Sequence, residues 1–107
     1  MSVGRGAVDL TGFLCKDMTI EARRRSEHTF LHVYTSLLEE HGVAGYPFDR
    51  CLTDYRLSML KSFANIVVAS TKGDLSPAQK QRTFAIVVPR FVIAILDHDA
   101  SSLLLTA

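Results

Sequence analysis

The sequence predicts an all-α protein with four or five helices in a single domain that spans residues 1–107. Apolar residues recur three or four positions apart along most of the chain, which is the spacing of one face of an α-helix. No segment alternates apolar and polar residues as a half-buried β-strand does. With 48% hydrophobic and 21% charged residues, the chain can bury a core and is not expected to be disordered.

The first long helix is predicted from Ile20 to His41. Thr19 can cap its start by accepting a hydrogen bond from a free backbone N–H, and Gly42 suits the left-handed residue that often follows a helix. The apolar positions of this helix are Ile20, Phe30, Leu31, Tyr34, Leu37 and Leu38. Their spacing predicts one buried face.

A second helix is predicted from Phe48 to Ala69, with Pro47 at its first position, where a missing N–H has no cost. Its apolar stripe consists of Phe48, Cys51, Leu52, Tyr55, Met59, Phe63, Ile66 and Val67. The turn-rich residues 70–75 follow and end this helix.

A third helix is predicted to begin at the capping box Ser76-Pro77-Ala78-Gln79. Pro89 lacks a backbone N–H and clashes with the preceding turn, which predicts a kink or break near Val88. The helix should then continue through Ile95. Asp97-His98-Asp99 marks a boundary before a last turn from Ala100 to Leu105.

Charge and cysteine content argue against several functional classes. The formal net charge of +1 gives no reason to expect nucleic acid or an anionic membrane as a partner. Arg23-Arg24-Arg25 lies beside Glu21 and Glu27, and we interpret it as a solvated face. Cys15 and Cys51 lack CxxC spacing, which favours two reduced, buried thiols, with one disulfide as the alternative.

The most apolar segment, Phe84 to Leu96, has 13 residues, whereas a membrane-spanning helix needs about 20. We expect it to be a buried core helix. The N-terminus has neither the basic region nor the apolar stretch of a signal peptide. A cytoplasmic protein is therefore expected.

Four short motifs occur in a recognisable order along the chain. They are Gly4-Arg5-Gly6-Ala7-Val8-Asp9-Leu10, Tyr46 followed by Phe48-Asp49-Arg50-Cys51, Asp54-Tyr55-Arg56, and Arg90 ahead of Ala94-Ile95-Leu96-Asp97-His98-Asp99-Ala100. Together they resemble the C-terminal part of the aminoglycoside phosphotransferase and choline-kinase-like superfamily, in particular the branch of ecdysteroid-kinase-like proteins. The resemblance implies the C-terminal helical subdomain of a protein-kinase-like fold, with residues 4–10 as a linker.

Members of this superfamily are ATP-dependent kinases of small-molecule hydroxyls. Phosphoryl transfer needs metal ions, nucleotide phosphates and a base around one reacting centre. This sequence has no His-Gly-Asp-type catalytic loop and no glycine-rich phosphate loop. The resemblance therefore implies a truncated, inactive member, a partial domain without catalytic residues, metal site or cofactor of its own. ATP and magnesium are implied only for a full-length member.

The resemblance also implies roles for particular residues. Asp9 matches an aspartate that braces the catalytic loop, and without that loop we expect Asp9 to be exposed or to cap its own helix. The later helices of such enzymes line the pocket of the acceptor substrate. The candidates for this pocket are Tyr46, Asp54, Tyr55 and Arg56, with Asp97 and Asp99 behind them.

Each of these residues also has a simpler interpretation. Tyr55 lies on the apolar stripe and can be a core aromatic, Asp54 can pair with Arg50 one turn earlier, and Arg56 can brace a neighbouring segment. His28 and His32 have the spacing of two metal ligands, but no further ligand completes a zinc site.

A different class of function fits the composition as well. A stand-alone helical interaction module would dimerise through its exposed apolar faces, because Phe84 to Leu96 is apolar on nearly every side. A helix bundle on a membrane surface is a third interpretation based on the same segment. The expected partners are thus a small-molecule hydroxyl substrate or a second copy of the chain, and not nucleic acid or a membrane.

Overall fold

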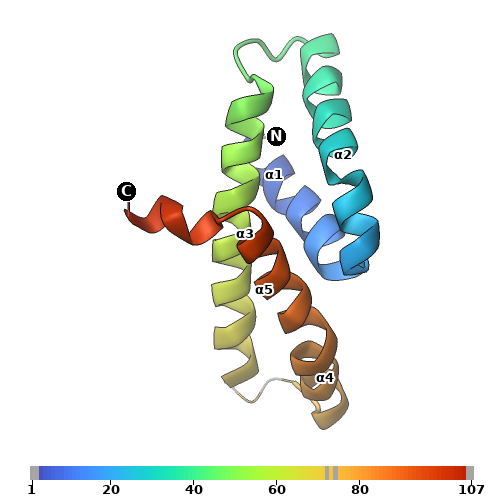
Figure 1. The fold of residues 1–107 in the computed structure, drawn as a ribbon, viewed down its shortest axis with the longest axis vertical. Helices are drawn as coiled ribbons and strands as arrows, with labels where there is room; N and C mark the ends of the chain where they lie inside the picture. The colour runs from blue at the N-terminus through green and yellow to red at the C-terminus, as the bar shows by residue number, and fades with distance from the viewer. Residues whose placement is uncertain (1–2, 72, 74, 106–107) are drawn as a thin grey trace.

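The computed structural model describes residues 3–71, 73 and 75–105, and these residues form an all-α structure without a β-strand (Figure 1). In chain order the elements are α1 (Val3–Thr11), the π-helical segment η1 (Gly12–Asp17), α2 (Ile20–Glu40), α3 (Phe48–Thr71), α4 (Pro77–Arg82), the π-helical segment η2 (Thr83–Val87), α5 (Val88–Asp97) and the 3-10 helix η3 (Ala100–Leu105). The predicted all-α class is confirmed, as is each of the long helices.

The longest helix, α3, is the element around which the others are arranged. It packs against α1, α2, α5 and η3, and Figure 1 shows it running along the long axis of the molecule. Residues 4–10, expected to be a linker, instead belong to α1. This helix lies against α3, and its residues Gly6 and Ala7 are buried, with the Tyr34 side chain of α2 next to Gly6.

Both ends of α2 follow the predicted local rules. Thr19 Oγ1 accepts a hydrogen bond of 3.2 Å from Ala22 N. At the other end Gly42 has a φ of +87°, the left-handed region that favours glycine. The N–H of Val43 donates to Leu38 O at 2.9 Å and that of Gly42 donates to Glu39 O at 3.1 Å, which is the Schellman arrangement.

Pro89 disturbs the third helix as predicted. The capping box at Ser76 is formed, with Ser76 N donating to Gln79 Oε1 and Gln79 N donating to Ser76 Oγ. The helix then widens into η2, where Val88 N donates to Thr83 O five residues earlier. A wider turn directly before Pro89 keeps its ring clear of the preceding carbonyl and tolerates its missing N–H.

The core lies between α3, η1 and α5, with one residue each from α2, η2 and η3. Its buried members are Leu14, Cys15, Leu31, Cys51, Tyr55, Met59, Val87, Phe91, Ala94 and Ala100. Both cysteines are free and fully buried, so the predicted pair of reduced thiols is confirmed and the alternative disulfide is not formed.

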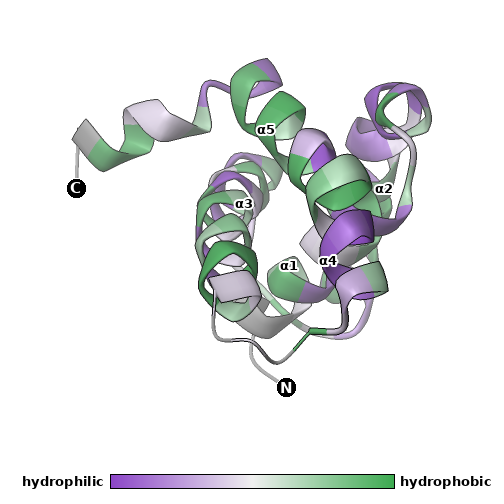
Figure 2. Ribbon diagram, turned by 90° about the horizontal axis from the view of Figure 1, so that it is seen from below, coloured by the Kyte–Doolittle hydropathy of each residue, from purple (hydrophilic) through white to green (hydrophobic). Residues whose placement is uncertain are grey.

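This core leaves much apolar surface uncovered. The segment expected to be a buried helix is buried on one face only, since Phe91 is 1% exposed whereas Phe84 is 54% and Leu96 68% exposed. The solvent-accessible area is 6721 Å², whereas a compact monomer of this mass exposes about 6,000 Å². In Figure 2 much of α5 and parts of α3 have the green of apolar residues. None of the described helices is long and apolar enough to cross a membrane.

The contact between α1 and α2 gives a test of the fold. A Cβ atom on Gly6 would overlap the Tyr34 hydroxyl and lie 2.7 Å from its Cζ. We expect Gly6→Ala to lower the free energy of unfolding by about 1–3 kcal/mol, because side chains must shift to admit the methyl group. Urea unfolding followed by circular dichroism measures this difference. Gly12→Ala is the matched control, since its Cβ meets no atom within 4 Å. Equal unfolding midpoints for the two variants would contradict the prediction.

Candidate functional site

Two of the predicted pocket residues meet at the start of α3. The Tyr46 hydroxyl donates a hydrogen bond of 2.7 Å to Asp54 Oδ2. The Arg50 guanidinium lies 5.8 Å from the centre of the Tyr46 ring, within the range of a cation–π contact. Arg50 thus contacts Tyr46, and the alternative Arg50–Asp54 ion pair is not among those formed in the described part of the chain. We call Tyr46, Arg50 and Asp54 the Tyr46 corner.

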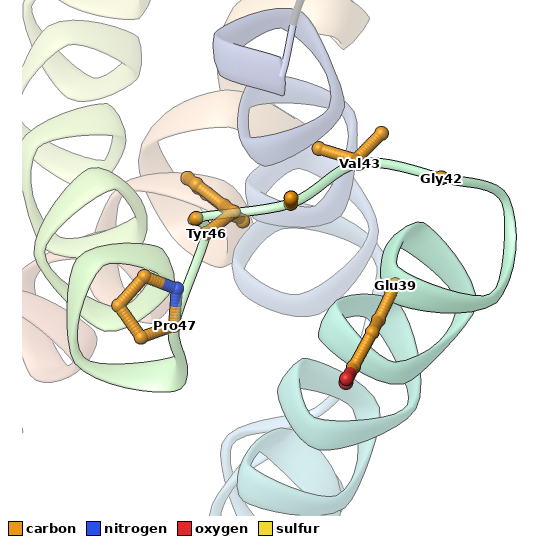
Figure 3. Close-up of a pocket in the computed structure, with 7 residues that line it drawn as sticks. Glu39, Gly42, Val43, Tyr46 and Pro47 are labelled. Atoms are coloured by element: carbon orange, nitrogen blue, oxygen red, sulfur yellow. The ribbon is translucent and has the colours of Figure 1, made fainter.

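Tyr46, alone among the residues of the Tyr46 corner, lines a hollow of about 550 Å³ in the loop between α2 and α3. The hollow is lined by Glu39, Gly42, Val43, Ala44, Gly45, Tyr46 and Pro47. Figure 3 shows that the side chains of Glu39 and Tyr46 extend in different directions, so these two polar side chains do not converge inside the hollow. Burial, followed by the hydrogen bond to Asp54, raises the pKa of Tyr46, which therefore remains a donor.

The other two pocket candidates lie elsewhere. Tyr55 is fully buried in the core, where its hydroxyl donates to Glu27 Oε2 at 2.9 Å and lies 3.4 Å from Cys15 Sγ. Arg56 donates to the carbonyl oxygens of His98 and Asp99 at 3.0 and 3.1 Å. The structure thus places Tyr55 and Arg56 in the simpler roles considered for them, a core aromatic and a brace. Asp9, the predicted structural brace, is exposed on α1, as expected.

A buried polar cluster that we did not predict joins α2, α3 and the end of α5. We call it the Glu27 cluster, and its members are Arg23, Arg24, Glu27, Tyr55, Asp97 and His98. Glu27 Oε2 accepts from Arg23 Nη1 at 3.0 Å as well as from Tyr55, and Glu27 Oε1 lies 2.9 Å from His98 Nε2. Glu27 therefore has partners on both oxygens.

Asp97 completes the Glu27 cluster at its solvent side. Its Oδ2 accepts from Arg23 Nη2 at 2.6 Å and from Arg24 Nε at 2.7 Å, while its Oδ1 accepts from Arg24 Nη2 at 2.9 Å. The fork of Arg24 thus binds the carboxylate through two parallel hydrogen bonds, the strong geometry for this pair. Asp97, predicted to stand behind a substrate pocket, here accepts hydrogen bonds from two arginines, and Asp97 and Glu27 together balance their charge.

The interpretation of Arg23-Arg24-Arg25 as a solvated face was wrong for Arg23, whose side chain is 1% exposed. The buried residues of α2 are Arg23, Glu27 and Leu31, each one turn after the last. Arg23 and Glu27, which have opposite charges, therefore lie on the same buried face as Leu31. The i,i+4 spacing of this pair, in line with Leu31, was a sign in the sequence that both could be buried. The sequence did not indicate their partners in α5.

Electrostatics fix the charge states within the Glu27 cluster. Burial raises the pKa of Glu27, but the hydrogen bond and charge of the His98 ring, together with the hydrogen bonds from Tyr55 and Arg23, lower it below its ordinary value. The hydrogen bond from Arg24, with that from Arg23, lowers the pKa of Asp97 from 3.8 to about 2. Burial raises the pKa of Cys15 to about 11, so this thiol is protonated and unreactive.

The Glu27 cluster has the properties of a structural centre. In the described residues no buried side-chain nitrogen or oxygen lacks a hydrogen-bond partner, so the cluster offers no unpaired group to a ligand. Nor do the described residues contain a group of three or more metal-ligating side chains. His32, considered for its metal-ligand spacing, stacks on the Phe48 ring with centroids 3.8 Å apart.

Comparisons with protein-family models, with curated proteins and with solved structures gave no match to this chain. The resemblance to the phosphotransferase superfamily thus stays a prediction from the motifs.

The Glu27 cluster predicts a large effect of a nearly isosteric change. Glu27→Gln removes the charge that Arg23 needs and presents an amide to groups that donate to the carboxylate. We expect the free energy of unfolding to fall by about 3 kcal/mol, because breaking a buried ion pair leaves an uncompensated charge. Glu21→Gln, at an exposed position in the first turn of the same helix, should change it by less than about 0.5 kcal/mol. Similar denaturation midpoints for both variants would show that the cluster adds little stability.

The low pKa of Asp97 predicts a loss of stability in acid. Because the folded-state pKa of about 2 lies below the ordinary 3.8, the unfolded chain binds more protons between these values. Stability from Asp97 is therefore complete above about pH 5 and falls as the pH approaches 2. Glu27 acts in the same direction because its pKa is also lowered. Thermal unfolding at a series of pH values should show a flatter dependence for Asp97→Asn, and Asp17→Asn, an exposed control, should keep the original slope. An unchanged slope for Asp97→Asn would contradict this.

Proposed function

We propose that this chain forms the acceptor-substrate side of an ATP-dependent small-molecule phosphotransferase related to the aminoglycoside phosphotransferase and choline-kinase-like superfamily. The acceptor would be a small molecule with a hydroxyl group. The observation that carries the proposal is the hydrogen bond between Tyr46, which lines the hollow between α2 and α3, and Asp54. It brings together two residues that the motifs assign to the acceptor pocket.

The chemistry of the Tyr46 corner suits a polar acceptor. An ionised carboxylate accepts hydrogen bonds only, so Asp54 can take them from hydroxyl or ammonium groups of a ligand. The Tyr46 hydroxyl holds one of its oxygens at 2.7 Å, which limits the positions that the carboxylate can take. Side chains fixed in this way lose less freedom on binding than mobile ones do.

The groups that bind nucleotide and move the phosphate would come from outside this sequence. ATP with Mg²⁺, a catalytic base and the residues that hold them are indispensable for phosphoryl transfer. We therefore expect the isolated chain to transfer no phosphate. The uncovered apolar residues of η2 and α5, among them Phe84 and Leu96, are available to pack against such a part.

The proposal is tested first on the transcript that encodes this chain. We expect the reading frame upstream to encode a His-Gly-Asp-type catalytic loop and a magnesium-binding aspartate. The full product is then assayed for phosphoryl transfer from ATP to a panel of small alcohols and amino sugars. Asp54→Asn should raise the KM for the acceptor about tenfold or more and leave the KM for ATP unchanged, since a charge-assisted hydrogen bond is lost only on the acceptor side.

Asp49→Asn, also in the first turns of α3 but exposed, is the matched control and should alter neither constant. An upstream reading frame without a catalytic loop would refute the proposal. So would an acceptor KM that Asp54→Asn does not change.

A second candidate function is a helical interaction module that associates with itself. The observation that favours it is the set of large apolar residues on the outside of α2, where Phe30, Val33 and Leu37 are 37–50% exposed. A soluble monomer rarely exposes a contiguous apolar patch of this kind without a partner.

A further inference from the structure

Three charged residues near the ends of α2 have no ion-pair partner among the described residues of the chain. Glu39 and Glu40 stand in the last turn, where the helix dipole disfavours negative charge. Arg25 is exposed near the opposite end. Arg23 and Arg24 are neutralised within the chain, but Arg25, Glu39 and Glu40 take part in none of the four ion pairs that the described residues form.

Between these charged ends, the exposed side of α2 is uncharged. From Ser26 to Leu38 the only formally charged residue is Glu27, which is buried. Phe30, Val33 and Leu37 follow the i, i+3, i+7 spacing of one helix face and are 37%, 50% and 47% exposed. Phe13 of η1, 46% exposed, extends this surface by an edge-to-face contact with Phe30 at 5.4 Å. We call Phe13, Phe30, Val33 and Leu37 the α2 face.

We propose that the α2 face binds the α2 face of a second copy of this chain, with the two helices antiparallel about a twofold axis near Val33. In this register Phe30 lies between Val33 and Leu37 of the second copy. Arg25 comes level with His41 of the second copy, one residue (a rise of about 1.5 Å) from Glu40. Two equivalent contacts of this kind form, one at each end, as an isologous interface requires.

Charge decides between this arrangement and its alternatives. A parallel pair would bring Arg25 against Arg25 and Glu40 against Glu40, and like charges across an interface oppose association. The antiparallel pair instead gives the Glu40 carboxylate a basic partner near an unfavourable helix end. An unrelated helix with an apolar stripe could cover the same residues, but the reversed charges at the two ends of α2 complement α2 itself.

This inference rests on the second candidate function, self-association, and specifies which residues form the interface and how the two copies are oriented. Phosphotransferase activity is a separate question, because the inference uses no residue of the Tyr46 corner.

Sedimentation equilibrium of the intact chain provides the test, with folding of every variant checked by circular dichroism. We expect a reversible dimer, and Val33→Glu should raise its dissociation constant at least about tenfold, because a charge enters both halves of the apolar contact. Val68→Glu is the matched control: Val68 is 49% exposed on α3, and its substitution should leave the dissociation constant within about twofold of the original.

Charge reversal tests the orientation. Arg25→Glu alone, or Glu40→Arg alone, should weaken the dimer about fivefold, and the two substitutions combined should restore it. Val33→Cys should form a disulfide between the two copies under mild oxidation, whereas Val68→Cys should not. The natural thiols do not compete, because Cys15 and Cys51 are fully buried.

Each outcome either supports or overturns the inference. A monomer up to millimolar concentration refutes both the inference and the interaction module. A dimer that Val33→Glu leaves intact refutes the inference alone, since association then uses another face. Failure of the combined charge reversal to restore the dimer refutes the antiparallel arrangement.

Discussion

The Glu27 carboxylate is the point at which α2, α3 and the end of α5 are joined. It is buried, and a buried charge is costly unless hydrogen bonds surround it. Arg23 supplies one partner from the same helix, Tyr55 another from α3, and the His98 ring lies against its second oxygen. The packing of three elements therefore depends on one ionised group, and the three elements must be in place together for that group to be satisfied.

Elements set by nearby residues were predictable. Thr19, Gly42 and the capping box at Ser76 act within four residues along the chain, and the structure contains each of them. The burial of Arg23 was predictable only in part: Glu27 is one turn away in line with Leu31, but the other partner of Arg23, Asp97, is 74 residues away. The charged residues next to Arg23 in the sequence suggest that it is exposed to solvent. Its contact with Asp97, which buries it, is visible only in the tertiary structure.

In the candidate site, too, the sequence did not reveal every contact that a residue makes. Asp54, Tyr55 and Arg56 are consecutive, and a helix turns about 100° per residue, so three adjacent side chains point in three directions. Asp54 meets Tyr46, Tyr55 enters the core, and Arg56 holds the carbonyl groups at the end of α5. A motif matched as one unit is thus divided among three different contacts. The helical period could have separated Tyr55 from Asp54, but the partner of Arg56 depends on how α5 crosses α3.

The Glu27 cluster, whose polar groups all have partners, determines how the helices pack, whereas the exposed apolar residues are available for association. The Glu27 cluster fixes how the helices pack, so the apolar residues left outside are exposed by a defined structure and not by the absence of one. They lie on separate parts of it, Val33 on α2 and Leu96 at the end of α5. A second copy on the α2 face would leave η2 and α5 available for a catalytic part. The two proposed associations are therefore compatible, and each can fail without affecting the other.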